Sequence, residues 1–184
     1  MGLIIGLVLL VVVVGLVGYA IALWNKIVRL SNRIDNAWSQ IDVQLKRRFD
    51  LIPNLVETVK GYASHEKETL EKVTAARTAG MNAQGPEQAA QAENMLTGAL
   101  KSLFAVAEQY PDLKANQNFL ALQEELTATE DKIAYSRQFY NDAVLKFNNM
   151  IQTFPGLLLK GSRTPREYFE VEGLDRVNAP QVSF

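Results

Sequence analysis

One stretch of the sequence, RRFDLIPNLVETVKGYASHE at residues 47–66, gathers most of the residue types that could carry out chemistry. It holds an arginine pair, an aspartate, a proline, an asparagine and the only histidine of the chain, His65. A di-metal site in a helical bundle needs two Glu-x-x-His motifs, and a zincin site needs a second histidine four residues after the first. Tyr62 precedes His65 by three residues and Thr69 follows it by four, so neither motif is present.

Few other ways of binding a metal or activating a nucleophile are open to this chain. It has no cysteine, which excludes thiolate ligands and a cysteine nucleophile. It also has no glycine-rich phosphate loop and no motif that places a base beside a hydroxyl group. Oxygen ligands for Mg²⁺ or Ca²⁺ stay conceivable, with Glu66, Glu93, Glu130 and Asp131 as candidates. The prediction is no catalytic residue, no metal ligand and no cofactor.

Glu66 interrupts an apolar stripe at helical spacing, which consists of Ile52, Val56, Val59, Ala63, Leu70 and Val73. A carboxylate that faces a core needs a partner, or it becomes neutral. Arg77, Lys101 or Arg137 could supply that partner, so a structural ion pair is the favoured interpretation of Glu66. His65 is interpreted as a surface or interhelical hydrogen-bonding residue rather than a catalyst.

The element that must position everything else is an N-terminal run, residues 2–24, which contains no charged side chain. As a helix this run would extend about 35 Å, enough to cross a hydrocarbon core of about 30 Å. The alternative is a cleaved signal peptide, because Ala20-Ile21-Ala22 resembles a cleavage site. No basic residue precedes the run, however, and the run is longer than a typical signal-peptide core. Residues 1–25 are therefore predicted to be a retained transmembrane anchor.

The charges that flank this run predict its orientation. Lys26, Arg29 and Arg33 follow the run, and basic residues next to a membrane helix favour the cytoplasmic side. We therefore expect the N-terminus outside and the rest of the chain on the cytoplasmic side. Over the whole chain the net charge is −1, and the basic residues do not interleave with aromatic residues, so no nucleic-acid partner is predicted.

Residues 26–154 show helical periodicity throughout. The first apolar stripe continues directly from the anchor, and the most regular one follows a three-four spacing from Phe119 to Phe154. Such a heptad pattern is typical of left-handed helix packing. No strand signal competes with it. The predicted fold class is therefore all-α, with one transmembrane helix that continues into an antiparallel four-helix bundle.

The first turn of that bundle is predicted within residues 47–66. Asp50 is a suitable N-cap, and Pro53 would fall in the first helical turn, where its missing amide has no intrahelical acceptor. We therefore expect a hairpin corner between helices one and two, with a single helix kinked at Pro53 as the alternative. The excess of polar residues there suggests a partner contact through Arg47, Arg48 and Asn54.

Residues 155–184 are predicted to be a mostly non-helical tail. Leu157, Leu158 and Leu159 precede a lysine, and we expect them to contact the bilayer surface; packing against the bundle or a neighbouring subunit is the alternative. The chain closes with Val182 and Phe184, a form that can add to the edge of a sheet in a partner. Docking of this end on the chain itself or across a subunit contact is the competing interpretation.

Several strings in a fixed order resemble the LemA family: RRFDLIPNLVETVKGYASHE, YNDAVLKFNNMIQTFP, REYFE and the closing APQVSF. The resemblance covers essentially the whole chain. It implies a membrane-anchored antiparallel four-helix bundle and no established enzymatic activity. The family also has a relative among magnetosome membrane proteins, which implies a role in organising or shaping a membrane.

The function predicted from these features is that of a non-enzymatic scaffold or adaptor that assembles with itself and organises the membrane. The expected partners are the lipid bilayer, further copies of the chain and an unidentified membrane protein. Close helix contact in the anchor is permitted by Gly2, Gly6, Gly18 and Ala22. The expected location is the bacterial plasma (inner) membrane. Two alternatives stay open: an adaptor for a membrane protease or envelope-stress partner, and a membrane-tethered enzyme.

Overall fold

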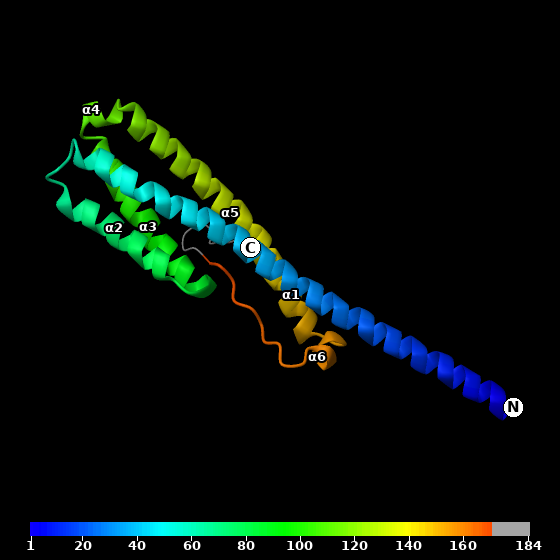
Figure 1. The fold of residues 1–184 in the computed structure, drawn as a ribbon. Helices are drawn as coiled ribbons and strands as arrows, with labels where there is room; N and C mark the ends of the chain where they lie inside the picture. The colour runs from blue at the N-terminus through cyan, green and yellow to red at the C-terminus, as the bar shows by residue number, and fades with distance from the viewer. Residues whose placement is uncertain (171–184) are drawn as a thin grey trace, which may run out of the picture. The chain divides into compact units, whose positions relative to one another are not determined.

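The computed structural model describes residues 1–170, and these residues form helices and connecting segments without a strand. The helices are α1 (Gly2–Lys60), α2 (Lys67–Asn82), α3 (Gly85–Ala107), α4 (Pro111–Lys114), α5 (Gln117–Gln152) and α6 (Gly156–Leu159). Figure 1 shows α1 and α5 as the two long helices. The all-α prediction is confirmed.

The chain divides into two compact units, and α1 and α5 contribute to both. The anchor unit comprises Met1–Trp38 and Phe139–Arg166. The bundle unit comprises Ser39–Gln138 together with the segment that begins at Glu167.

The anchor unit contains the candidate membrane span. The apolar side chains of residues 3–19 and those of Ile21 and Trp24 are exposed, and the most apolar 18-residue window of α1 has a mean hydropathy of 3.0. Exposed apolar side chains over this length suit a lipid environment rather than water. The helix therefore has the length and the surface that the predicted anchor requires.

After the span, residues 27–38 of α1 pack on the end of α5 within the same unit, and Ile27, Ile34 and Ala37 are buried there. The rings of Trp38 and Tyr140 lie 5.6 Å apart between centroids, and the Arg33 guanidinium lies 4.7 Å from the centre of the Phe139 ring. The chain after α6 returns along these helices, because the Asn148 side chain both donates to the Arg166 carbonyl and accepts from its amide.

The bundle unit is an antiparallel four-helix bundle formed by residues 39–60 of α1, by α2 and α3, and by residues 117–138 of α5 (Figure 1). Its buried side chains recur at three and four residues along each helix, as the sequence predicted. They include Ile41, Leu45, Ile52, Leu55 and Val59 on α1, Leu70 and Val73 on α2, Leu96, Leu100 and Leu103 on α3, and Phe119, Leu126 and Ile133 on α5. Burial of one apolar face per helix stabilises this arrangement.

Helix α1 does not end at the corner that the sequence predicted. It continues through Pro53 to Lys60, so the hairpin predicted at Asp50 is wrong, and one helix runs through Pro53. A proline inside a helix removes the donor to the carbonyl four residues earlier, here Phe49, at a cost of about 3 kcal/mol or more. The Nε of Arg77 in α2 donates to that Phe49 carbonyl over 2.7 Å, which replaces the lost hydrogen bond.

The actual corner lies at residues 61–66, between α1 and α2. His65 is exposed in this turn, and Glu66 is half-buried immediately before α2. The exposure of His65 agrees with its interpretation as a surface residue, whereas the interpretation of Glu66 as a core-facing carboxylate on a helix is wrong. The predicted stripe assumed one uninterrupted helix from Asp50 to Val73. The helix ends at Lys60, so residues before and after the turn do not share one helical face.

Candidate functional site

The predicted interaction residues Arg47 and Asn54 lie beside one open groove between α1 and α5 in the bundle unit. The groove has a volume of about 420 Å³ and is lined by Asn54, Thr58, Asn118, Ala121, Leu122 and Glu125. Arg47 borders it, because its guanidinium contacts the Glu125 carboxylate over 3.4 Å, with both side chains about half exposed. The tertiary structure thus brings the amide and hydroxyl groups of Asn54 and Thr58 on α1 close to Asn118 and Glu125 on α5, a segment far away in the sequence.

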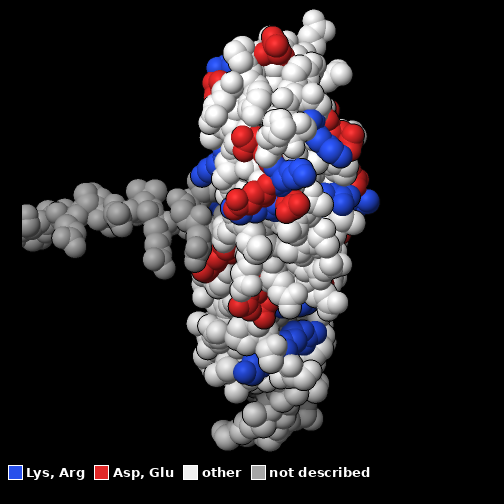
Figure 2. All heavy atoms as spheres, turned by 90° about the vertical axis from the view of Figure 1, so that its left-hand side faces the viewer, with Lys and Arg blue, Asp and Glu red and all other residues white. Residues whose placement is uncertain are grey.

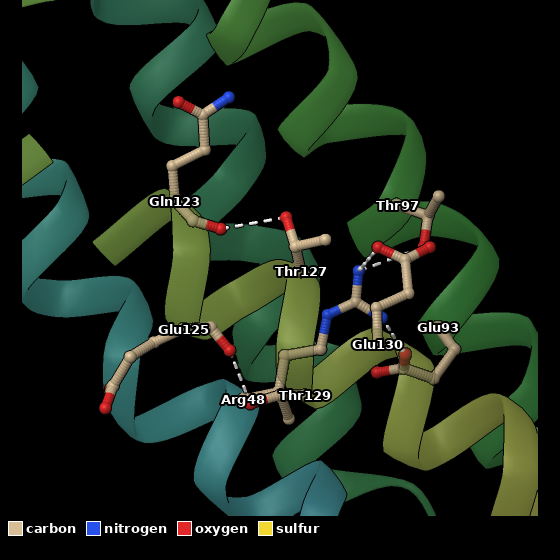
Figure 3. A network of polar contacts seen from close by, with 8 residues as sticks. All are labelled: Arg48, Glu93, Thr97, Gln123, Glu125, Thr127, Thr129 and Glu130. Carbon is tan, nitrogen blue, oxygen red and sulfur yellow. Dashed lines mark hydrogen bonds and ion pairs between the residues drawn. The ribbon is translucent and has the colours of Figure 1, made fainter. Parts of the chain in front are cut away.

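Arg48, the third residue of the predicted interaction site, points into the bundle instead. Its side chain is only 3% exposed and forms an ion pair with Glu93 of α3 over 2.5 Å. Thr97 accepts a second hydrogen bond from Arg48 over 3.2 Å, and Glu130 of α5 lies 3.5 Å away. Figure 3 shows the guanidinium between these two helices. A partner contact through Arg48 would require it to leave this network, so Arg47 and Asn54 are the surface members of the predicted site.

The buried side chains of Arg48 and Glu93 are charged, but not all of their polar atoms form hydrogen bonds. Within the described part of the chain, Arg48 Nε and Glu93 Oε1 are buried and have no hydrogen-bond partner. Burial raises the pKa of Glu93 above its usual value, although Arg48 opposes that shift. A buried ion pair with unsatisfied atoms recovers its desolvation cost only in part. The network therefore connects α1, α3 and α5, and its net contribution to stability is expected to be small.

The carboxylates considered as ligands for a hard cation do not gather at one site. Glu93 and Glu130 both contact Arg48, so an arginine side chain occupies the position between them. Glu66 lies in the turn before α2, and Asp131 lines a separate shallow depression on α5. Among residues 1–170 no cluster of three potential metal ligands was found.

The predicted membrane-surface residues lie in and beside the short helix α6 of the anchor unit. Leu157 and Leu158 are exposed and Leu159 is half-buried. The Arg163 guanidinium stacks over the Trp24 ring, 4.3 Å from its centre. The predicted docking residues Val182 and Phe184 lie outside the described residues.

Charge on the surface is mixed. Figure 2 shows lysine and arginine side chains interspersed with aspartate and glutamate on the face in view, without a large field of one sign. Ion pairs such as Lys46–Asp50 and Lys72–Glu68 connect residues four positions apart on one helix. Exposed pairs of this kind stabilise the individual helices slightly. A surface with mixed charges does not favour a highly charged ligand.

Sequence reasoning missed the pairing of Arg48 with Glu93, although both residues carried a signal. Glu93 is in phase with the buried stripe of α3, which consists of Ala89, Leu96, Leu100, Leu103 and Ala107. Arg48 is in phase with Leu45 and Ile52 of α1. Opposite charges that each replace one apolar step of a stripe indicate a buried ion pair. Glu66 gave the same signal in the sequence, but it lies in the turn before α2 and not on a buried helix face.

Comparison with known proteins gives one family and several relatives. A model of the LemA family matches residues 37–184, which include the part of α1 after residue 36 and every later helix. Protein LemA of Metamycoplasma hominis is 34% identical over 134 residues, covering 71% of this chain and 60% of the relative. Magnetosome proteins MamQ 1 and MamQ 2 of Paramagnetospirillum magneticum are each 27% identical over 169 residues, covering 78% of this chain and 62% of the relative. The chain spans about three fifths of the length of these curated relatives.

Proposed function

This chain belongs to the LemA family, and from that premise we propose that it is a membrane-anchored scaffold that assembles with itself through its helical bundle. It is a membrane-associated protein of the LemA type, with a single N-terminal apolar helix that fits a membrane anchor. The scaffold acts by contacts with protein and lipid rather than by catalysis. Relatives named as magnetosome proteins support a task in organising a membrane.

One observation carries the proposal. The residues predicted from the sequence to contact a partner, Arg47 and Asn54, converge on one open groove of a chain that also carries a long exposed apolar helix. The groove offers amide and hydroxyl groups from α1 and α5 and one half-exposed carboxylate. Such a lining suits the polar edge of a second protein surface, because exposed hydrogen-bonding groups gain partners without a large desolvation cost.

The proposed location is the bacterial plasma (inner) membrane, with the N-terminus outside and the bundle in the cytoplasm. Lys26, Arg29 and Arg33 support this orientation because they follow the apolar run directly.

Mass measurement of the full-length chain in lipid nanodiscs tests the scaffold role. The chain has a mass of 20.5 kDa, and particles that contain several copies are expected. A monodisperse monomer that forms a one-to-one crosslink with a single membrane protein would replace the scaffold with an adaptor for that partner.

A matched pair of variants tests the groove. Ala121 lines the groove, and Ala128 lines the other depression on the same helix; both side chains are exposed. Ala121→Arg should fill the groove and lower the number of copies per particle, whereas Ala128→Arg should leave it unchanged. Equal behaviour of the two variants would exclude the groove as the contact surface.

A further inference from the structure

Three exposed apolar side chains lie in and immediately before α6 in the anchor unit. Phe154 is 79% exposed, Leu157 is 45% exposed and Leu158 is 72% exposed. These three residues lie within five consecutive positions at the end of α5 and the start of α6. Large apolar side chains gathered on a surface mark a site of interaction with protein or lipid.

The position of this group relative to the membrane span is set by Trp24. Residues 2–24 span about 35 Å as a helix, so Trp24 lies where a hydrocarbon core of about 30 Å ends. The segment after α6 contacts Trp24 directly, because the Arg163 guanidinium stacks on its ring 4.3 Å from the centre. The segment with the exposed apolar residues is therefore held at the depth of the interface, where tryptophan is enriched.

The turn between α5 and α6 keeps the segment in this position. A Cβ atom at Gly156 would collide with the carbonyl oxygen of Met150. Only glycine permits this close return of the chain, which directs Leu157 and Leu158 away from the core of the unit, where both are exposed.

The charges around the segment match an anionic membrane surface. Residues 1–34 and 150–166 together contain six basic side chains, namely Lys26, Arg29, Arg33, Lys160, Arg163 and Arg166, and no acidic one. Basic side chains next to a membrane helix attract anionic headgroups. The first carboxylate met along α1, Asp35, already contacts Arg166 over 3.2 Å.

We propose that residues 154–163 form a second membrane contact, distinct from the span, that lies in the interface of an anionic bilayer. Phe154, Leu157 and Leu158 enter the boundary between headgroups and acyl chains, and Lys160 with its basic neighbours contacts lipid phosphate. Lipid is favoured over a second copy of the chain as the occupant because this surface is continuous with the membrane span through Trp24. This membrane contact does not depend on self-assembly, so an experiment can disprove it without disproving the scaffold role.

The absence of cysteine from the natural chain allows a direct test with single-cysteine variants of the full-length protein. Leu157→Cys and Leu158→Cys are labelled separately with a polarity-sensitive dye and reconstituted in phosphatidylcholine vesicles with or without phosphatidylglycerol. Blue-shifted emission and quenching by a spin-labelled lipid rather than by aqueous iodide are expected. Both effects should increase with phosphatidylglycerol.

Leu145→Cys is the matched control, because Leu145 is 47% exposed and lies in the same unit. It precedes the end of α5 by about 10 Å along the helix axis, at 1.5 Å per residue. Its dye should remain accessible to iodide in both kinds of vesicle. Helical circular dichroism equal to that of the unmodified chain shows that each variant is folded.

Three results would overturn the proposal. The dyes at Leu157 and Leu158 could be as accessible to iodide as the dye at Leu145, which would leave the segment in water. Their emission could depend on the ratio of protein to lipid and not on lipid composition, which would assign the surface to a second copy. Their emission could also be blue-shifted equally with and without phosphatidylglycerol, which would remove the headgroup contact of Lys160.

Discussion

Two adjacent arginines of α1 show how strongly position in the bundle changes the role of one side-chain type. Arg47 lies on the surface, about half exposed, and contacts Glu125 over 3.4 Å. Arg48 is almost fully buried and contacts Glu93 over 2.5 Å. Successive residues of an α-helix point about 100° apart, so one position of difference moves the guanidinium from the groove to the interior.

The difference teaches which arginine matters for stability and which one is available to a partner. An exposed ion pair contributes about 0–1 kcal/mol. A buried pair contributes little on balance, yet removal of one partner costs about 3–5 kcal/mol because the other charge stays buried without compensation. Replacement of the buried Arg48 is therefore expected to destabilise the bundle, whereas replacement of the half-exposed Arg47 is expected to have little effect on stability.

The largest effect is expected when Arg48 is replaced by methionine. Arg48→Met leaves the Glu93 carboxylate buried without its cation and should lower the free energy of unfolding by about 3–5 kcal/mol. Denaturant unfolding of the full-length chain in micelles, followed by circular dichroism, measures this loss. A loss similar to that of an Arg47 variant would mean that the two arginines do not differ as proposed.

The double variant Arg48→Met/Glu93→Leu tests the reason for that loss. It removes both charges and fills the space with apolar atoms, so most of the stability should return. A double variant as unstable as Arg48→Met alone would show that packing, and not the unpaired carboxylate, causes the destabilisation.

Arg77 is an intermediate case, because it is half-buried and binds a neutral carbonyl. Arg77→Met should cost about 1–3 kcal/mol, the range for leaving a buried acceptor unsatisfied. In a chain that also carries Pro53→Ala, the restored amide can donate to the Phe49 carbonyl, and the same Arg77 substitution should cost less. Equal costs in the two chains would mean that Arg77 does not compensate for the proline.

The pH dependence of stability tests the electrostatics of the buried pair. Burial raises the pKa of Glu93, so the folded chain binds a proton at this carboxyl more readily than the unfolded chain. The contribution to stability is then complete below the unfolded pKa and is lost as pH rises through the folded pKa. The natural chain should therefore lose stability relative to Glu93→Gln as pH rises from acidic to neutral. Paired unfolding curves across this range measure the trend, and the opposite trend would contradict it.

The smallest effect is expected at the surface pair. Arg47→Gln should change the free energy of unfolding by about 1 kcal/mol or less, and added salt should reduce even that difference through screening. A salt-independent loss above that value, measured in the same unfolding assay, would show that Arg47 belongs to the folding core. Reduced self-assembly without reduced stability is the result that the proposed contact through the groove requires.

Much of this architecture follows from the sequence alone. The charge-free length of residues 2–24 predicts an apolar helix long enough to cross a membrane, because length and hydropathy need no tertiary information. The recurrence of apolar residues at three and four predicts the helices and most of their buried faces, because side chains that far apart share one face of a helix. The sequence also predicts a partner contact through Arg47 and Asn54, because polar residues are concentrated in residues 47–66, and that contact stays a prediction.

Other features were decided only by the tertiary structure. Asp50 and Pro53 form a valid local signal for a helix start, yet α1 continues, because Arg77 from another helix replaces the lost hydrogen bond and the apolar stripe continues from Leu45 to Val59. The choice of Glu93 as the partner of Arg48 likewise depends on the register between α1 and α3, which are separated by two turns and the whole of α2. Sequence periodicity reports which residues share a face within a few turns of one helix. The register and the hydrogen bonds between helices depend instead on where the connecting turns lie and on how the buried faces pack together.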